Sequence, residues 1–437
     1  MQYRYSGSSI FFLFFIVVFG VSGCVSPMGT TFDKLPPGIW RGALYLEQSA
    51  VMLVGRKKKD VDLVMDRTGE LPFNFEVSYD ENQEMRIELI NADERIRVDE
   101  IEYGWDKSTA KDTIIMRFKS MDSYIKAIFE HDLMEGFWYV NYKEGYKIPF
   151  KAYHGNPDRF YTDGTVSNEN YSGRYNVEFK EKDGKSFPAV AEFEQNGNKI
   201  KGTFLTETGD FRYLEGNVLG NKLYLSCFDG SHAYLFEGKV IEPGKITGLF
   251  RSGTQYVASW EAQLNSEAKL PDPFKAVEYD SLTPLNLEAI GLNGAKVSLN
   301  DPKFSDRKKI IAIMGTWCPN CLDETTFIKE QLAKGRLKDY AIINVGFERY
   351  PDTTKCLSIL NTYKETHQIP YEIWYGGKSD KKVAQEKFPL LKKLIAFPTL
   401  IILDEKNKIK HVYSGFTGPA TSEYGAFVKQ FENLTQN

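Results

Sequence analysis

A long stretch of alternating sequence, from Lys34 to about Gln263, constrains the fold of this 437-residue chain more than any other feature. Short runs rich in Tyr, Phe, Val and Ile, such as Thr113 to Phe118, are broken by turns rich in Gly, Asn, Asp and Lys. Successive side chains of a strand point to opposite faces of a sheet, so a period of two predicts β-strands. Asn196-Gly197-Asn198 is a typical hairpin turn. We expect an all-β, antiparallel region.

The β pattern repeats itself. Gly38 to Gly42 opens one unit, and Tyr171 to Val177 opens a second with similar residues. Each unit continues through a strand with a central proline and closes on a short strand that contains glycine. Repetition at this scale predicts two related antiparallel sheets, packed as one elongated or barrel-like module. We interpret this module as a spacer, a dimerisation unit or a docking unit for a partner.

Changes in pattern divide the chain into segments. A polar stretch that begins near His154 separates the β units, and Lys269 to Pro273 is typical of a linker. The residues from 282 onward form a further domain, and its α/β class is implied by the family resemblance given below. The predicted segments are a signal peptide (1–23), a tether (24–37), β-rich units (38–153 and 171–263), a linker (264–281) and the C-terminal α/β domain (282–437).

The C-terminal domain contains a Cys-x-x-Cys pair, Cys318 and Cys321, directly after the apolar run Lys308 to Met314. The run predicts a buried parallel strand, and Thr325 to Leu337 predicts a helix. Both thiols would then lie at a helix N-terminus, where free amide N–H groups and the helix dipole favour a thiolate. This placement indicates thiol-disulfide chemistry.

The alternative interpretation of Cys-x-x-Cys is half of a zinc site. Structural zinc takes four Cys or His ligands, in paired clusters. Cys24, Cys227 and Cys356 are isolated, and the five histidines have no metal-type spacing. The sequence therefore favours redox chemistry over zinc, and we expect no metal and no other cofactor.

A second motif lies at Leu394 to Thr399, where Pro398 heads the apolar strand Leu400 to Leu403. Proline cannot donate a hydrogen bond to a neighbouring strand, so its position needs a special reason, such as a cis peptide facing the active site. With both motifs in view, the segment from Leu282 to the C-terminus resembles the thioredoxin superfamily. It is most similar to the TlpA/ResA-like membrane-tethered thiol-disulfide oxidoreductases.

The resemblance implies roles for individual residues. Cys318 matches the attacking cysteine, which is exposed in that family, and Cys321 the resolving cysteine. Pro398 matches the cis-proline that faces them, and Glu324 the acid that handles their protons. Four neighbours are implied to contact the substrate: Trp317, Pro319, Phe397 and Thr399.

Some of these residues also have structural interpretations. Glu324, like Asp323, fits a favourable acid in the first turn of a helix. Trp317 fits a packing residue equally well. For Glu348, at the end of the apolar run from Ala341, we prefer a solvated strand terminus to an active-site role.

The N-terminal residues indicate the compartment. Ile10 to Val21 is an apolar run of about twelve residues, which is the length of a signal-peptide core and too short for a membrane span. The tetrapeptide that ends in Cys24 resembles the lipobox of bacterial lipoproteins, in which this cysteine is acylated. A cleaved signal with a coincidental cysteine is the alternative. We expect a lipid-anchored protein of the cell envelope, outside the cytoplasm, on either the inner or the outer membrane.

Charge and the remaining cysteines limit the other options. The net charge of −4 argues against nucleic acid as a partner, because phosphate binding needs clustered Lys and Arg. The basic run from Arg56 to Lys59 fits a solvated turn. Cys227 and Cys356 fit small core residues, although a disulfide between them is also compatible with the sequence.

Two functions follow from these observations. The first is an anchored thiol-disulfide oxidoreductase that exchanges disulfides with envelope proteins and has an upstream membrane redox partner. Its direction of electron flow is open, because Pro319 departs from the order common in reducing relatives. The second is a β-rich binding or assembly lipoprotein in which the thioredoxin-like domain is only a scaffold.

Overall fold

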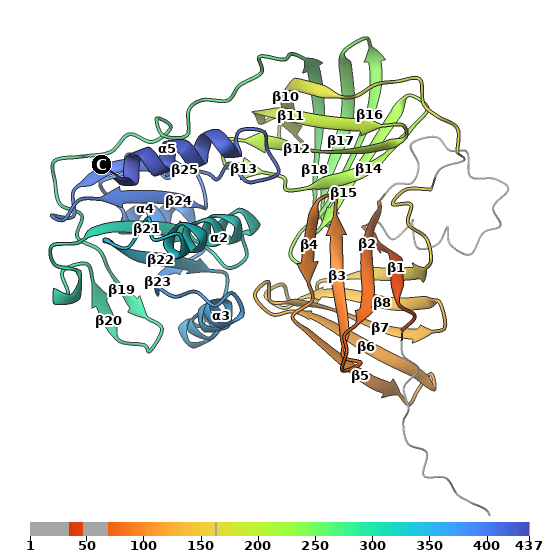
Figure 1. The fold of residues 1–437 in the computed structure, drawn as a ribbon, viewed down its shortest axis with the longest axis horizontal. Coiled ribbons are helices and arrows are strands. Elements are labelled where there is room, and N and C mark those ends of the chain that lie inside the picture. The colour runs from red at the N-terminus through yellow and green to blue at the C-terminus, as the bar shows by residue number, and fades with distance from the viewer. Residues whose placement is uncertain (1–34, 47–68, 162–163, 437) are drawn as a thin grey trace, which may run out of the picture.

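The computed structural model describes residues 35–46, 69–161 and 164–436. In this part of the chain three sheets form three bodies: an open sheet, a barrel and a C-terminal α/β domain (Figure 1). The predicted fold class, an all-β antiparallel region followed by an α/β domain, is confirmed. The predicted signal peptide, Cys24 and the basic run from Arg56 to Lys59 lie outside the described residues.

The open sheet has the strand order β4-β3-β2-β1-β9-β8-β7-β6-β5, and every pairing in it is antiparallel. Its inner face carries the alternate apolar residues that the period-two pattern predicts, among them Ile125, Ala127 and Phe129 on one strand. Its strands are β1 (Gly38–Tyr45), β2 (Glu70–Tyr79), β3 (Met85–Asn91), β4 (Glu94–Arg97), β5 (Glu100–Asp106), β6 (Lys111–Phe118), β7 (Ser123–Glu130), β8 (Leu133–Val140) and β9 (Lys147–His154).

The second sheet closes on itself, because β11 pairs with both β10 and β12. Phe204, Phe236 and Phe250 stack inside it with ring centroids 4.5 and 4.3 Å apart, so side chains fill the barrel. A two-residue strand, β13, extends its rim. The strands are β10 (Gly173–Glu181), β11 (Ser186–Asn196), β12 (Lys199–Thr206), β13 (Gly209–Asp210), β14 (Leu214–Leu219), β15 (Lys222–Phe228), β16 (Ala233–Glu242), β17 (Lys245–Ser252) and β18 (Tyr256–Leu264).

One apolar cluster joins the barrel to the open sheet, and a separate cluster fills the barrel itself. Phe228, at the end of β15, is fully buried among aromatic rings of the open sheet, with Phe73 and Trp138 at centroid distances of 4.6 and 5.1 Å. Buried polar contacts connect the same two bodies, since Asn91 Nδ2 donates to the Phe228 carbonyl at 3.0 Å. The two sheets therefore form one unit, which we call the β region (residues 38–264).

The C-terminal domain is built on a mixed sheet of order β20-β19-β23-β22-β21-β24-β25. Strands β21, β22 and β23 are parallel, β24 runs antiparallel to β21, and β25 pairs antiparallel with β24. Side chains of α2, α3 and α5 share one apolar cluster, and those of α4 belong to another. The strands are β19 (Glu288–Gly291), β20 (Lys296–Ser298), β21 (Lys308–Met314), β22 (Tyr340–Glu348), β23 (Glu372–Lys378), β24 (Thr399–Leu403) and β25 (Ile409–Ser414). The helices are η1 (Pro302–Phe304), α2 (Pro319–Ala333), α3 (Thr353–Thr366), α4 (Lys381–Lys387) and α5 (Tyr424–Gln436).

Helix α2 begins earlier than the sequence predicts. The prediction placed it at Thr325 to Leu337, whereas it begins at Pro319 and ends at Ala333. Proline is favoured at the first helical position because it has no N–H to leave unsatisfied, and the Cys318 sulfur accepts from the Cys321 amide. The Cys-x-x-Cys motif is therefore the first turn of the helix, and not the loop before it.

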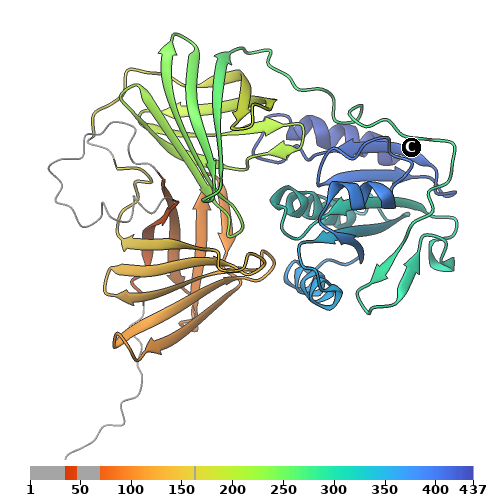
Figure 2. The same cartoon turned by 180° about the vertical axis from the view of Figure 1, so that it is seen from behind.

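The segment that connects the β region to the C-terminal domain runs along the outside of that domain (Figure 2). It contacts that domain through the Ser414 amide, which donates to the Pro273 carbonyl at 3.3 Å. No helix within the described residues is long and apolar enough to cross a membrane.

Candidate active site

The two motif cysteines lie at the carboxyl end of β21. Cys318 is the N-cap of α2, and the Cys321 amide donates to its sulfur at 3.3 Å. Both are unpaired thiols in this structure. Burial raises the pKa of Cys321 well above its ordinary value, and the neighbouring Cys318 raises it further. Cys321 therefore stays protonated until a base removes its proton.

The proline predicted to face the thiols does so. The Phe397–Pro398 peptide bond is cis, and the Cys318 thiol donates to the Phe397 carbonyl at 3.5 Å. The Trp317 ring lies edge-on to that of Phe397 at 5.4 Å, and its Nε1 donates to the Phe347 carbonyl at 2.8 Å. Thr399 is buried, and its hydroxyl donates to the Ala396 carbonyl. Trp317 and Phe397 thus border the thiols, whereas the Thr399 hydroxyl is hydrogen-bonded within the loop that contains Pro398.

Glu324 lies one helical turn after Cys321, with only 1% of its surface exposed. Neither of its carboxyl oxygens has a hydrogen-bond partner among the described residues. Burial raises the pKa of Glu324 well above its ordinary value, and a negative charge on Cys318 adds to the rise. An uncharged, unpartnered acid beside two thiols is suited to exchanging protons with them.

The prediction for Glu348 was wrong. This residue is 2% exposed, and its carboxylate accepts from the Thr316 amide at 2.9 Å and from the Thr316 hydroxyl at 2.8 Å. It holds the turn that leads to Cys318. The error arose because β22 is buried along its whole length, so its last residue lies under the active-site turn and not at the surface.

Glu348→Gln is expected to remove a pH dependence of stability. Burial raises the pKa of Glu348 to about 7 against the Thr316 hydrogen bonds, so folding favours the protonated acid. The stabilisation that protonated Glu348 gives to the folded state is complete below the pKa that this residue has in the unfolded chain. It is lost as the pH rises through about 7. Between pH 5 and 8 the wild type should lose roughly 1–3 kcal/mol that the Gln variant keeps, measured by urea unfolding. The exposed Glu386→Gln is the control, and equal pH slopes in wild type and Glu348→Gln would refute the assignment.

The β region supplies residues to this site that the sequence did not indicate. Arg212 is buried, and its Nη1 donates to Asp323 Oδ2 at 2.8 Å and to the carbonyl of Pro319, inside the Cys-x-x-Cys motif, at 3.1 Å. The second terminal nitrogen of Arg212, Nη2, donates to the Glu94 carboxylate of the open sheet. Burial raises the pKa of Asp323 to about 7, against the charge of Arg212. The Asp323 carboxylate therefore forms an ion pair between the two domains, and it is not a solvated acid in the first turn of the helix.

Arg212 could not be found from the sequence, because no motif surrounds it and it lies more than a hundred residues before the cysteines. Cys227 and Cys356 are both free and buried, so the structure contains no disulfide between them. The Cys356 thiol donates to the Tyr350 carbonyl at 3.3 Å, and burial raises the pKa of Cys227 well above its ordinary value. Both are core residues.

Comparison with known proteins finds similarity in the C-terminal part of the chain. Residues 269–427 match the model of the Redoxin family. Similar solved structures include the thioredoxin domain of a thiol-disulfide oxidoreductase from Bacteroides vulgatus (21% identity, 35% of this chain and 99% of that one, TM-score 0.27). StoA from Bacillus subtilis is 16% identical over 35% of this chain and 98% of its own, with a TM-score of 0.25. A DsbF homologue from Corynebacterium diphtheriae is 19% identical over 38% and 98%, with a TM-score of 0.28. No curated protein matches the chain.

Proposed function

We propose that the C-terminal domain, a thioredoxin-fold oxidoreductase domain with a Redoxin-family match, exchanges disulfides with proteins of the cell envelope. The observation that carries the proposal is the pairing of the two thiols at one helix end, where the Cys321 amide donates to the Cys318 sulfur. The adjacent sulfurs can close into a disulfide, which is what the second displacement of thiol–disulfide exchange requires.

The reaction then has two displacements. The Cys318 thiolate attacks one sulfur of the client disulfide, whose S–S bond breaks, and the released client thiolate takes a proton. Cys321 gives its proton to a base and attacks the Cys318 sulfur, which releases the second client thiol. The client gains two electrons and two protons, and the enzyme dithiol is oxidised to a disulfide. The same steps in reverse oxidise a client dithiol.

Glu324, which is uncharged at rest, first gives its proton to the released client thiolate, and as a carboxylate it then receives the proton of Cys321. A charge on Cys318 contributes to its raised pKa, and this contribution disappears once Cys318 is bonded to a client sulfur. The acidity of Glu324 therefore rises at the step that needs a carboxylate. This coupling links proton transfer to the formation of the mixed disulfide.

The envelope location and the anchor are part of the proposal. They are supported by the apolar N-terminal run and by the tetrapeptide that ends in Cys24. An acylated Cys24 with two or more chains would hold the protein firmly on a membrane. An upstream membrane redox partner would then return Cys318 and Cys321 to their starting state.

The test is a trap with Cys321→Ser. We expect this variant to accumulate a mixed disulfide between Cys318 and a client, because the second displacement is removed. Purified Cys24→Ser/Cys321→Ser protein is mixed with an oxidised protein substrate such as insulin, and the adduct is identified by mass spectrometry. In cells, the adducts should contain envelope proteins, and they should fractionate with membranes only when Cys24 is present.

The matched control adds Cys318→Ser to the trap. The proposal fails if the trap forms no adduct even when Arg212→Ala is added to remove the contact of the β region with Pro319 and Asp323, or if adducts persist without Cys318. In that outcome the second function, a β-rich binding lipoprotein with a thioredoxin-like scaffold, becomes the better assignment. The burial of Cys318 beneath the β region is the observation that favours it.

A further inference from the structure

The attacking thiol is covered by the chain's own β region. Cys318 is only 6% exposed and Cys321 is fully buried, although the resemblance implied an exposed attacking cysteine. The surface around Cys318, which we call the dithiol face, consists of Trp317, Pro319, Asn320, Asp323 and the turn 415–418. Every part of this face contacts the β region.

The hairpin of residues 207–212, which includes β13 and which we call the β12–β13 turn, lies against the dithiol face. The Asn320 side chain donates to the Asp210 carbonyl at 3.1 Å, and the Gly418 amide donates to the Asp210 carboxylate at 2.8 Å. A Cβ on Gly209 would lie 2.0 Å from Asn320 Nδ2, and one on Gly415 would lie 2.8 Å from the Glu207 carbonyl. Glycine at 415 permits this approach to the backbone of the turn, and glycine at 209 leaves room for the Asn320 side chain.

Arg212 connects the β12–β13 turn to α2 through an ion pair with Asp323. Its guanidinium is 5% exposed and lies between Asp323 on the dithiol face and Glu94 on the open sheet. The contact therefore joins the C-terminal domain to both halves of the β region. A buried cation between two carboxylates is a specific contact, because removing the cation leaves their charges uncompensated.

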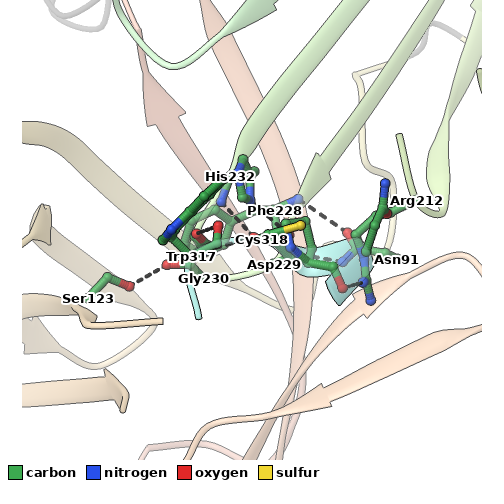
Figure 3. Close-up of polar contacts among 12 residues, drawn as sticks. Asn91, Ser123, Arg212, Phe228, Asp229, Gly230, His232, Trp317 and Cys318 are labelled. Carbon is green, nitrogen blue, oxygen red and sulfur yellow. Dashed lines mark hydrogen bonds and ion pairs between the residues drawn. The ribbon is translucent and has the colours of Figure 1, made fainter. Parts of the chain in front are cut away.

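The rest of the rim is also covered. Arg349 lies over the rings of Trp317 and Tyr142 at 4.3 and 4.5 Å and donates to the Tyr142 hydroxyl. The Ser231 hydroxyl is 3.5 Å from the Trp317 carbonyl. Figure 3 shows Cys318 and Trp317 beside the loop that carries Asp229 and His232. The β region thus covers the dithiol face from the helix end to the tryptophan.

Disulfide exchange requires a client sulfur to meet the Cys318 sulfur in line with its own S–S bond. A protein client would have to rest on the same dithiol face that the β region occupies. We propose that the β region is a cap that closes the dithiol site against protein clients, with the β12–β13 turn in the place of a client segment. This inference rests on the proposed function, and it makes cap opening a required step of exchange.

The test compares the access of small and large reagents to Cys318. Reduced Cys24→Ser protein is treated with iodoacetamide or with a polyethylene-glycol maleimide, and modification of Cys318 is followed by mass spectrometry. We expect Arg212→Ala to raise the rate with the large reagent by about tenfold or more. Removing one partner of a buried ion pair should shift the equilibrium between the closed and the open cap by at least that factor. Reduction of insulin should rise with it.

A second pair of variants does not depend on Arg212. Gly209→Leu places a side chain where Asn320 lies, while Gly184→Leu puts the same residue at a positive φ in another barrel turn with nothing within 4 Å. Only Gly209→Leu should expose Cys318. The buried Cys227 and Cys356 report unfolding, because both stay unmodified in a folded protein.

The outcomes separate the two proposals. Equal access to the large reagent in wild type, Arg212→Ala and Gly209→Leu overturns the cap. Increased access without any exchange, neither reduction of insulin by the dithiol form nor oxidation of a dithiol peptide by the disulfide form, supports the cap and contradicts the proposed function. Increased access together with faster reduction supports both.

Discussion

Glu324→Gln is expected to lengthen the lifetime of the mixed disulfide by about a hundredfold, the lower end of what a positioned acid–base group contributes. The raised pKa of Cys321 leaves its thiol protonated near neutral pH, so its attack on Cys318 needs a proton acceptor. Glu324 is buried beside Cys318 and has no competing partner among the described residues. A glutamine has almost the same shape but cannot accept the proton.

The measurement separates the two steps of exchange. Rapid acid quenching gives the formation and decay of the mixed disulfide with an oxidised peptide, and the comparison is made in the Arg212→Ala background, where we expect the cap to be open. Decay should slow while formation stays within a few fold, and raising the pH should restore decay, because hydroxide then removes the Cys321 proton. Glu330→Gln, on the exposed face of the same helix, is the control. Unchanged decay in Glu324→Gln would show that solvent takes the proton.

Phe228→Ala is expected to destabilise the β region by about 3–5 kcal/mol, the usual cost of truncating a buried phenylalanine. The ring is fully buried and contacts Phe73, Phe118 and Trp138 of the open sheet, with centroids 4.6, 5.8 and 5.1 Å away. It comes from the barrel, so its loss leaves a cavity at the junction of the two bodies. The free energy of unfolding is measured with urea by far-ultraviolet circular dichroism.

Trp105→Ala is the matched control, because this aromatic side chain belongs to the same β region, on the open sheet, but is 49% exposed. It should change the free energy of unfolding by less than about 0.5 kcal/mol. A cost near that value for Phe228→Ala would mean that the barrel and the open sheet are stable without their shared core. It would also weaken the description of the β region as one unit.

Local sequence patterns were sufficient to predict several strands of the C-terminal domain. The apolar run Lys308 to Met314 is β21, and the strand after Pro398 is β24. Both are short, buried strands whose composition can be read without knowing their neighbours. The period-two alternation likewise identified an antiparallel β region, since strand faces depend on residues close together in the chain.

Contacts between distant residues were not predictable. Glu348 and Asp323 are charged residues of the kind found at surface positions, yet Glu348 is buried and Asp323 is half-buried, because another element packs over each of them. Arg212 has no signal of its own, because an arginine in a turn is ordinary until Asp323 and Glu94 lie on either side of it. The closure of the barrel depends in the same way on the pairing of β11 with β12.

The sequence by itself determined the two kinds of domain and the reactive pair, because strand alternation, the helix start and the Cys-x-x-Cys spacing are properties of neighbouring residues. Only the tertiary structure decided that the β region lies on the dithiol face. That outcome depends on the fit of two surfaces more than a hundred residues apart, with glycines that permit the close approach and Arg212 between two carboxylates. No local pattern encodes such a fit, because each of its residues is compatible with many other positions in a fold.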